Sequence, residues 1–221
     1  MSGVTSPAKR SPVRPYAGVS AAERIASRRE RLLDAGLELY GTRGYAATGV
    51  KDVCRQAGLT DRYFYESFRD SGELFVAVFD RGTAELFELV REAVAGVAPQ
   101  PEAQARAAVD SFVRALSEDP RKARVIFTEA ARAGAEADRH MRATLRQFAS
   151  LIVETARPHL AAGVAPPTLQ MGAAALVGAI ERVIIEWQDG ELDASIEEIV
   201  DYLVELFLAA GPTFGLPPRA R

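Results

Sequence analysis

A short run of side chains in the first third of the chain has the chemistry needed to bind a nucleic acid. The run comprises Thr60, Asp61, Arg62, Tyr63 and Tyr65. The guanidinium of Arg62 can pair with a guanine edge, and hydroxyl groups such as that of Thr60 can donate to phosphates. Such groups act together only if one rigid element presents them on one face.

Two short helices joined at Gly58 would position this run. Four apolar residues recur at helical spacing before the glycine: Val50, Val53, Cys54 and Ala57. Thr48 is the expected cap of this helix, and Gly58 allows the left-handed backbone that a tight turn needs. Thr60 then caps a second helix over Asp61 to Phe68, whose two phenylalanines face inward. The pattern predicts a helix-turn-helix.

The charge of the chain is divided unevenly. Residues 1–70 carry 12 positive and 8 negative side chains, a net charge of +4, whereas the remainder carries −7. A polyanion is therefore attracted to the N-terminal part, where Lys51 and Arg55 lie on the first helix of the pair.

Composition narrows the class of protein. The chain has 221 residues, 48% of them hydrophobic, which is enough for a substantial core. Cys54 is the single cysteine, so no internal disulfide forms, and its position favours a small buried side chain over a reactive thiol. The N-terminus lacks the apolar run of a signal peptide, which predicts a cytoplasmic protein. The apolar segment from Met171 to Ile185 is interrupted by charges and is expected to be a buried helix with no role in a membrane.

The remaining segments all have helical patterns, so we expect an all-α fold of about nine helices. Residues 1–19 are predicted to be a flexible basic arm, 20–70 a three-helix domain that contains the helix-turn-helix, and 71–221 a larger helical domain. Ser20 with Glu23 and Ser195 with Glu198 have the spacing of capping boxes. A helix begins at Pro120 after Asp119, and Val125, Ile126 and Phe127 are expected to continue it.

The last two predicted helices, 168–188 and 195–210, have more apolar surface than one core-facing stripe requires. Small residues at Gly172, Gly178 and Ala179 allow a neighbour to approach closely. A homodimer formed through these helices explains the excess, although an ordinary monomer core remains the alternative.

The stretch from Arg28 to Phe75 resembles the TetR (tetracycline repressor) family of bacterial regulators. The resemblance rests on Gly44-Tyr45, on Thr48, on Ala57-Gly58-Leu59-Thr60 at the turn, and on Tyr65 with Phe68. It implies a homodimer that grips a palindromic DNA operator and is released by a small molecule bound in the C-terminal domain.

By that resemblance the DNA contacts are expected at Tyr45, Thr48, Lys51, Thr60, Asp61, Arg62, Tyr63 and Tyr65. Two departures limit the transfer. Ser71 replaces the usual lysine, which removes one phosphate contact. Arg62 stands where a small residue is common, so the base preferences of relatives do not carry over.

Candidate residues for an effector pocket are large apolar side chains on different helices: Phe112, Phe127, Met141, Phe148 and Trp187. They predict a largely apolar ligand. His140 and His159 have no metal-ligand spacing, and no nucleophile motif or phosphate loop is present. We therefore expect neither an enzyme nor a metal or cofactor.

These observations predict a ligand-responsive transcriptional regulator, more specifically a repressor. Two alternatives remain open. One is an all-helical enzyme or small-molecule or lipid-binding protein that uses the C-terminal cavity, and the other is a DNA-organising protein that needs no ligand. Occupancy of a few palindromic promoters, of the whole genome, or of no DNA would separate the three.

Overall fold

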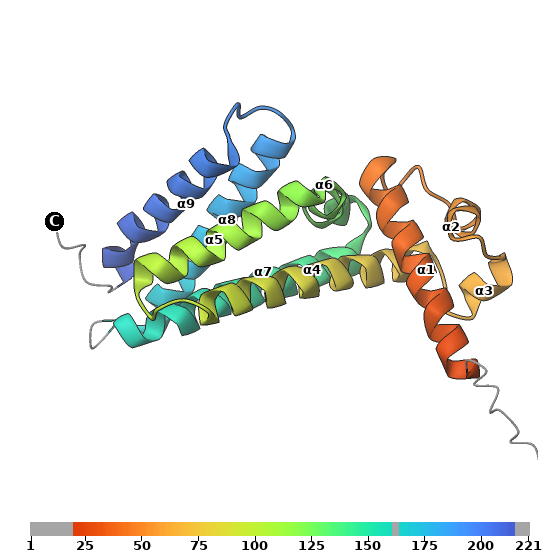
Figure 1. Ribbon diagram of the computed structural model, residues 1–221, viewed down its shortest axis with the longest axis horizontal. Helices are drawn as coiled ribbons and strands as arrows, with labels where there is room; N and C mark the ends of the chain where they lie inside the picture. The colour runs from red at the N-terminus through yellow and green to blue at the C-terminus, as the bar shows by residue number, and fades with distance from the viewer. Residues whose placement is uncertain (1–19, 161–163, 215–221) are drawn as a thin grey trace, which may run out of the picture.

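The computed structural model describes residues 20–160 and 164–214, and these ranges contain nine α-helices with short π and 3-10 segments and no strand (Figure 1). The all-α prediction is confirmed. Three helices, α1 (Ala21–Thr42), α2 (Val50–Ala57) and α3 (Asp61–Tyr65), form a unit at one end of an elongated molecule. The predicted basic arm at residues 1–19 lies outside the described residues.

Helix α1 begins where its sequence predicts. The Ser20 hydroxyl accepts from the Glu23 N–H at 3.1 Å, and the Glu23 carboxylate accepts from the Ser20 N–H at 2.6 Å, so the capping box is complete. Further along, α1 buries one apolar stripe that packs against α2, α3 and α4. The stripe includes Leu32, Leu33, Leu39 and Tyr40.

Helix α4 (Ser71–Ala95) runs from the three-helix unit into the rest of the molecule (Figure 1). Its first turns bury Leu74 and Phe75 in the core shared with α1, and its later turns bury Leu86 and Val90 further along. One helix thus contributes buried side chains to both halves.

The break that the sequence predicts at Asp119-Pro120 is present, but the chain from 120 to 132 departs from the single α-helix expected there. Helix α5 (Pro101–Glu118) is followed by a four-residue α6 (Pro120–Ala123), by a π-helical segment η1 (Arg124–Glu129) and by a 3-10 turn η2 (Ala130–Arg132). The expectation that Val125, Ile126 and Phe127 continue an α-helix is wrong. Their turn is wider by one residue, a form that is often found at functional sites.

The remaining elements are α7 (Ala135–Ala156), η3 (Arg157–His159), α8 (Pro166–Gln188), α9 (Ile196–Ala210) and η4 (Gly211–Phe214). Helix α7 packs on α4 and α8, and α9 packs on α5. The predicted capping box at α9 is present, because the Ser195 hydroxyl accepts from Glu198 N–H and the Glu198 carboxylate accepts from Ser195 N–H.

Helix α8 is long and apolar enough to cross a membrane by composition alone, and 28% of its most apolar window is buried. Core helices of proteins without membrane segments pass the same test, so this observation is weak evidence for a membrane. The expectation that this segment is a buried helix is wrong for the single chain. Its small residues Ala174, Ala175 and Gly178 lie on an exposed face.

Candidate DNA interface and ligand cavity

The turn between α2 and α3 has the geometry of a helix-turn-helix. Gly58 has φ 61° and ψ 39°, the left-handed conformation that its residue type favours. The Arg31 guanidinium of α1 donates to the carbonyl oxygens of Ala57 at 2.5 Å and of Gly58 at 3.2 Å. These bonds satisfy carbonyls at the end of α2 and fix the turn to α1.

The exposed residues of α3 are those that a DNA groove would meet. The Arg62 side chain is 84% exposed and pairs loosely with Glu66 at 3.3 Å, one turn further on. Tyr65 is 60% exposed, and Asp61 is exposed as well. Thr60 is the N-cap residue, as predicted, and its side chain makes no capping hydrogen bond. The hydroxyl of Thr60 is therefore available to a ligand.

Tyr63 is held more firmly than its neighbours. The Arg28 guanidinium of α1 lies 4.4 Å from the centre of the Tyr63 ring, and the same arginine pairs with Glu66 at 3.3 Å. The ring is half-buried. Helix α3 ends at Tyr65, so the prediction that it continues to Phe68 is wrong, although Phe64 and Phe68 are buried as expected.

Two other predicted contacts have structural roles. Thr48 is not the cap of α2, because Gly49 holds that position. Thr48 is 7% exposed and its hydroxyl donates to the Gly44 carbonyl at 2.8 Å, which removes it from the surface that a phosphate could reach. The Tyr45 ring packs on Tyr40 and Phe75, with centroids 5.6 Å and 5.1 Å away. Lys51 is exposed on the first turn of α2.

Cys54 is buried at the crossing of α2 and α3, with 3% of its surface exposed. Burial, together with the neighbouring Asp61 carboxylate, raises the pKa of the Cys54 thiol to about 11. The thiol is therefore neutral at physiological pH, which agrees with its interpretation as a small apolar side chain.

A cavity of about 170 Å³ runs through the C-terminal domain. Helix α4 contributes residues from Phe79 to Val94, so the cavity extends roughly 22 Å along this helix at 1.5 Å per residue. The other walls come from α5, η1, α7, α8 and α9. Most of the lining is apolar, which suits a long apolar ligand.

Four of the five predicted pocket residues line this cavity: Phe112, Phe127, Met141 and Phe148. Three of them form a row of aromatic contacts, with Phe112 centred 6.5 Å from Phe127 and 5.8 Å from Phe148. Trp187 does not line the cavity. Its indole N–H donates to the Ala194 carbonyl at 2.8 Å, so it braces the loop between α8 and α9.

The histidines lie apart from any metal-binding arrangement. Nδ1 of His140 lies 2.8 Å from an Asp80 carboxylate oxygen, and Nε2 of His159 lies 3.3 Å from the side-chain oxygen of Gln104 at one end of the cavity. Within 20–160 and 164–214, no three His, Cys, Asp or Glu residues are placed to hold a metal ion.

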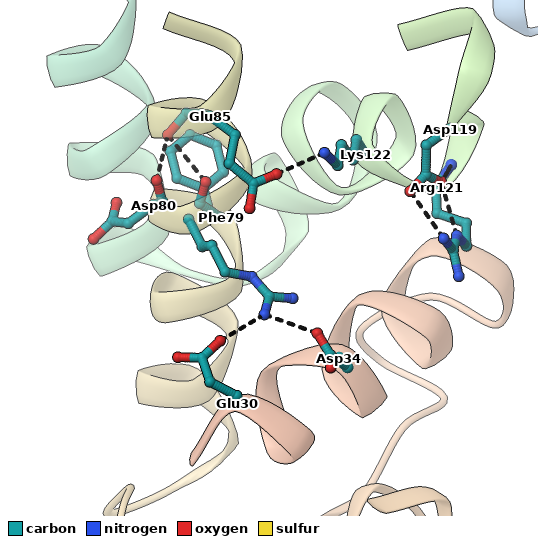
Figure 2. A network of polar contacts seen from close by, with 10 residues as sticks. Glu30, Asp34, Phe79, Asp80, Glu85, Asp119, Arg121 and Lys122 are labelled. Atoms are coloured by element: carbon teal, nitrogen blue, oxygen red, sulfur yellow. Dashed lines mark hydrogen bonds and ion pairs between the residues drawn. The ribbon is translucent and has the colours of Figure 1, made fainter. Parts of the chain in front are cut away.

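Polar contacts join the three-helix unit to α4 and α6. The Arg81 guanidinium of α4 pairs with Glu30 and Asp34 of α1, and Arg121 of α6 is held by Asp119 (Figure 2). Arg121 also reaches Glu38 of α1 at 2.6 Å. Gly41 makes this approach possible, because a Cβ there would lie 2.4 Å from Cβ of Arg121.

Glu129 is a buried residue whose contact with the turn between α1 and α2 cannot be predicted from local sequence patterns. It ends η1, is 2% exposed, and its carboxylate accepts from the Tyr45 N–H at 2.8 Å. Arg132 pairs with the same carboxylate at 3.2 Å. The contact spans 84 residues of sequence, so no local spacing could reveal it. Phe127, two residues earlier, lines the cavity, and η1 thus joins the cavity to the turn between α1 and α2.

Comparison with known proteins places this geometry among DNA-binding regulators. Residues 32–78 match the family model described as bacterial regulatory proteins, tetR family. Over 121 residues the chain is 32% identical to the HTH-type transcriptional activator FasR of Mycolicibacterium smegmatis. That match covers 54% of this chain and 55% of FasR, about half the length of either protein.

Solved structures agree over more of the chain. FadR of Bacillus subtilis in complex with stearoyl-CoA superposes with a TM-score of 0.69 at 16% identity, over 80% of this chain and 96% of that one. AibR in complex with isovaleryl coenzyme A and operator DNA gives 0.63 at 19% identity, over 81% and 97%. These TM-scores show that the three proteins share a fold.

Proposed function

As a member of the TetR family of bacterial transcriptional regulators, the chain has a DNA-binding role, and we propose that it is a homodimer whose hold on a palindromic operator is controlled by a largely apolar effector. One observation carries the proposal. An exposed α3 and an apolar cavity lie in one molecule and are joined by α4 and by η1. Such a protein acts in the cytoplasm, where the operator is.

The DNA contacts that we propose are Lys51, Thr60, Asp61, Arg62, Tyr63 and Tyr65. In a dimer, two copies of α3 would enter successive major grooves, about 34 Å apart. Arg62 is the residue suited to read a base, because its side chain is 84% exposed on α3 and can bind guanine with two hydrogen bonds.

Arg62→Ala tests this assignment. We expect the variant to lose about 1–3 kcal/mol of specific operator binding, because one bidentate base contact is removed. Fluorescence anisotropy on the operator and on a scrambled duplex at fixed salt measures both affinities. Arg55→Ala is the control: the Arg55 side chain is 74% exposed and paired within α2, so its loss should weaken both duplexes alike. An unchanged preference of Arg62→Ala for the operator would contradict the assignment.

We propose that the dimer forms through the exposed faces of α8 and α9. Met171 is 66% exposed and Tyr202 is 61% exposed, and both belong to helices that are otherwise apolar. Two exposed small residues, Ala174 and Gly178, would let a second α8 pack closely.

Gly178→Glu is expected to convert the dimer to a monomer. No atom lies within 4 Å of a Cβ at this position, so the single chain accommodates a side chain there. A carboxylate in the proposed interface would be left without water or a partner. Sedimentation velocity gives the mass, and circular dichroism verifies the fold. A variant that folds and remains dimeric would contradict an interface that includes this face of α8.

The proposed effector occupies the cavity with an apolar body. FadR and AibR provide the support, since those relatives in fold hold ligands with acyl groups.

Ala108 and Ala84 offer a matched pair for a test, because Ala108 of α5 lines the cavity and Ala84 of α4 is exposed outside it. We expect the neutral dye N-phenyl-1-naphthylamine to fluoresce on binding the wild type. Ala108→Trp should abolish this signal and Ala84→Trp should retain it. Equal signals from the two variants would contradict the proposal.

Effector binding would act by shifting a population of conformations. An effector that displaces Phe127 or tilts α4 would favour the state in which the two copies of α3 no longer match one DNA turn. In that state the operator is released. Release measured by anisotropy during a titration with stearoyl-CoA, the ligand of the FadR structure, is the direct test of control by acyl groups.

Repression is the direction of control that we propose, because an occupied operator hinders the polymerase until the effector arrives. Activation is the second candidate, since the relative FasR is named a transcriptional activator. Deleting the gene separates the two: transcripts beside the footprinted operators should rise under repression and fall under activation.

A further inference from the structure

Glu181 on α8 is the one acidic side chain among the described residues that line a largely apolar cavity, whose polar lining also includes Gln104 and His159. It lies one helical turn after Val177, which also lines the cavity, so the two residues lie on the same side of α8. The side chain is half-buried, and the loss of hydration raises the pKa of its carboxyl above the ordinary value. The charged form is therefore solvated less well than a surface carboxylate.

The carboxylate of Glu181 has no partner in the described chain. No side chain or backbone group within 20–160 or 164–214 gives it a hydrogen bond or an ion pair. The adjacent Arg182 pairs with Glu186, and among the described lining residues none is a lysine or an arginine. Carboxylates withdrawn from water are normally paired, so Glu181 is free for a partner that enters the cavity.

We propose that Glu181 selects ligands that carry a basic nitrogen on an apolar body. The inference rests on the proposed function, in which this cavity receives the effector. A protonated amine neutralises the carboxylate and donates a charge-assisted hydrogen bond to it in surroundings of low dielectric constant. A carboxylate or phosphate at the same position is repelled. The ligand would thus share its apolar body, and not its polar group, with the acyl-coenzyme A compounds bound by FadR and AibR.

Three probes with the same tail test the selection: dodecylamine, dodecanol and dodecanoate, each below its micelle concentration. Their affinities are measured by displacement of N-phenyl-1-naphthylamine from the dimeric wild type and from Glu181→Gln. On the wild type we expect the amine to bind about tenfold more tightly than the alcohol, and dodecanoate to bind most weakly. In Glu181→Gln the amine should fall to the affinity of the alcohol, while the alcohol is unchanged.

Glu191→Gln is the matched control, because Glu191 is exposed in the turn after α8 and does not line the cavity. This variant should keep the wild-type order of affinities. Equal binding of the three probes to the wild type, or an amine preference that survives Glu181→Gln, overturns the inference while dye and dodecanol binding still support the apolar cavity. A change in dimer mass without a change in the order also overturns it, because the carboxylate then serves the subunit interface. Absence of binding by the dye and all three probes rejects the proposed function and the inference together.

Discussion

Glu129→Ala is expected to lower the free energy of unfolding by about 2–5 kcal/mol, because the substitution removes a charged hydrogen bond and leaves the Tyr45 N–H without its acceptor. The contact lies where η1 meets the turn between α1 and α2, so the loss affects both halves of the molecule. Urea denaturation followed by far-ultraviolet circular dichroism measures the change.

Glu85→Ala is the control for this prediction. Glu85 of α4 pairs with Lys122 of α6 at 2.6 Å, but its side chain is 51% exposed (Figure 2). An exposed ion pair contributes about 0–1 kcal/mol, so this variant should unfold almost as the wild type does. Losses of equal size in the two variants would refute the special importance of the buried contact.

Gly41→Ala is expected to destabilise the protein by about 3 kcal/mol through overpacking. The added Cβ would lie 2.4 Å from Cβ and 2.8 Å from the backbone Cα of Arg121, so α1 and α6 must separate. Separation also strains the Arg121–Glu38 ion pair. Thermal unfolding monitored by circular dichroism measures the loss, and limited proteolysis would detect a loosened N-terminal unit.

A second buried glycine distinguishes overpacking from a general effect of alanine. A Cβ at Gly82 of α4 would meet only Cδ1 of Ile126, at 3.9 Å, which is an ordinary contact. Alanine is the better helix former, so Gly82→Ala should stabilise the protein by about 0.5–1 kcal/mol. If Gly41→Ala behaves in the same way, the close approach of α1 and α6 is not a constraint.

Local sequence was a good guide wherever local chemistry decides the structure. Helix ends could be predicted at the two capping boxes, Ser20 with Glu23 and Ser195 with Glu198, because each bond joins residues three positions apart. The end of α2 could be predicted because Gly58 itself favours the left-handed backbone. Thr48 misled the prediction, since Gly49 takes the cap position and the threonine hydroxyl turns back to Gly44.

Features set by tertiary packing could not be predicted in this way. The π-helical segment η1 has two sets of neighbours distant in sequence, the cavity on one side and the turn between α1 and α2 on the other. Trp187 has the size and polarity of a pocket residue. Only the structure shows that its indole N–H instead donates to the Ala194 carbonyl in the loop between α8 and α9. The partnerless state of Glu181 likewise depends on residues distant in sequence.

The double contact of η1 has a thermodynamic consequence for the ligand as well as for the DNA. If a ligand that moves Phe127 weakens operator binding by some factor through Glu129, then the operator must weaken that ligand by the same factor. Operator DNA and ligand would then oppose each other's binding to the protein. The ligand concentration needed for a response would therefore rise with the number of operator sites present. Titrating the ligand with and without operator DNA measures that factor directly.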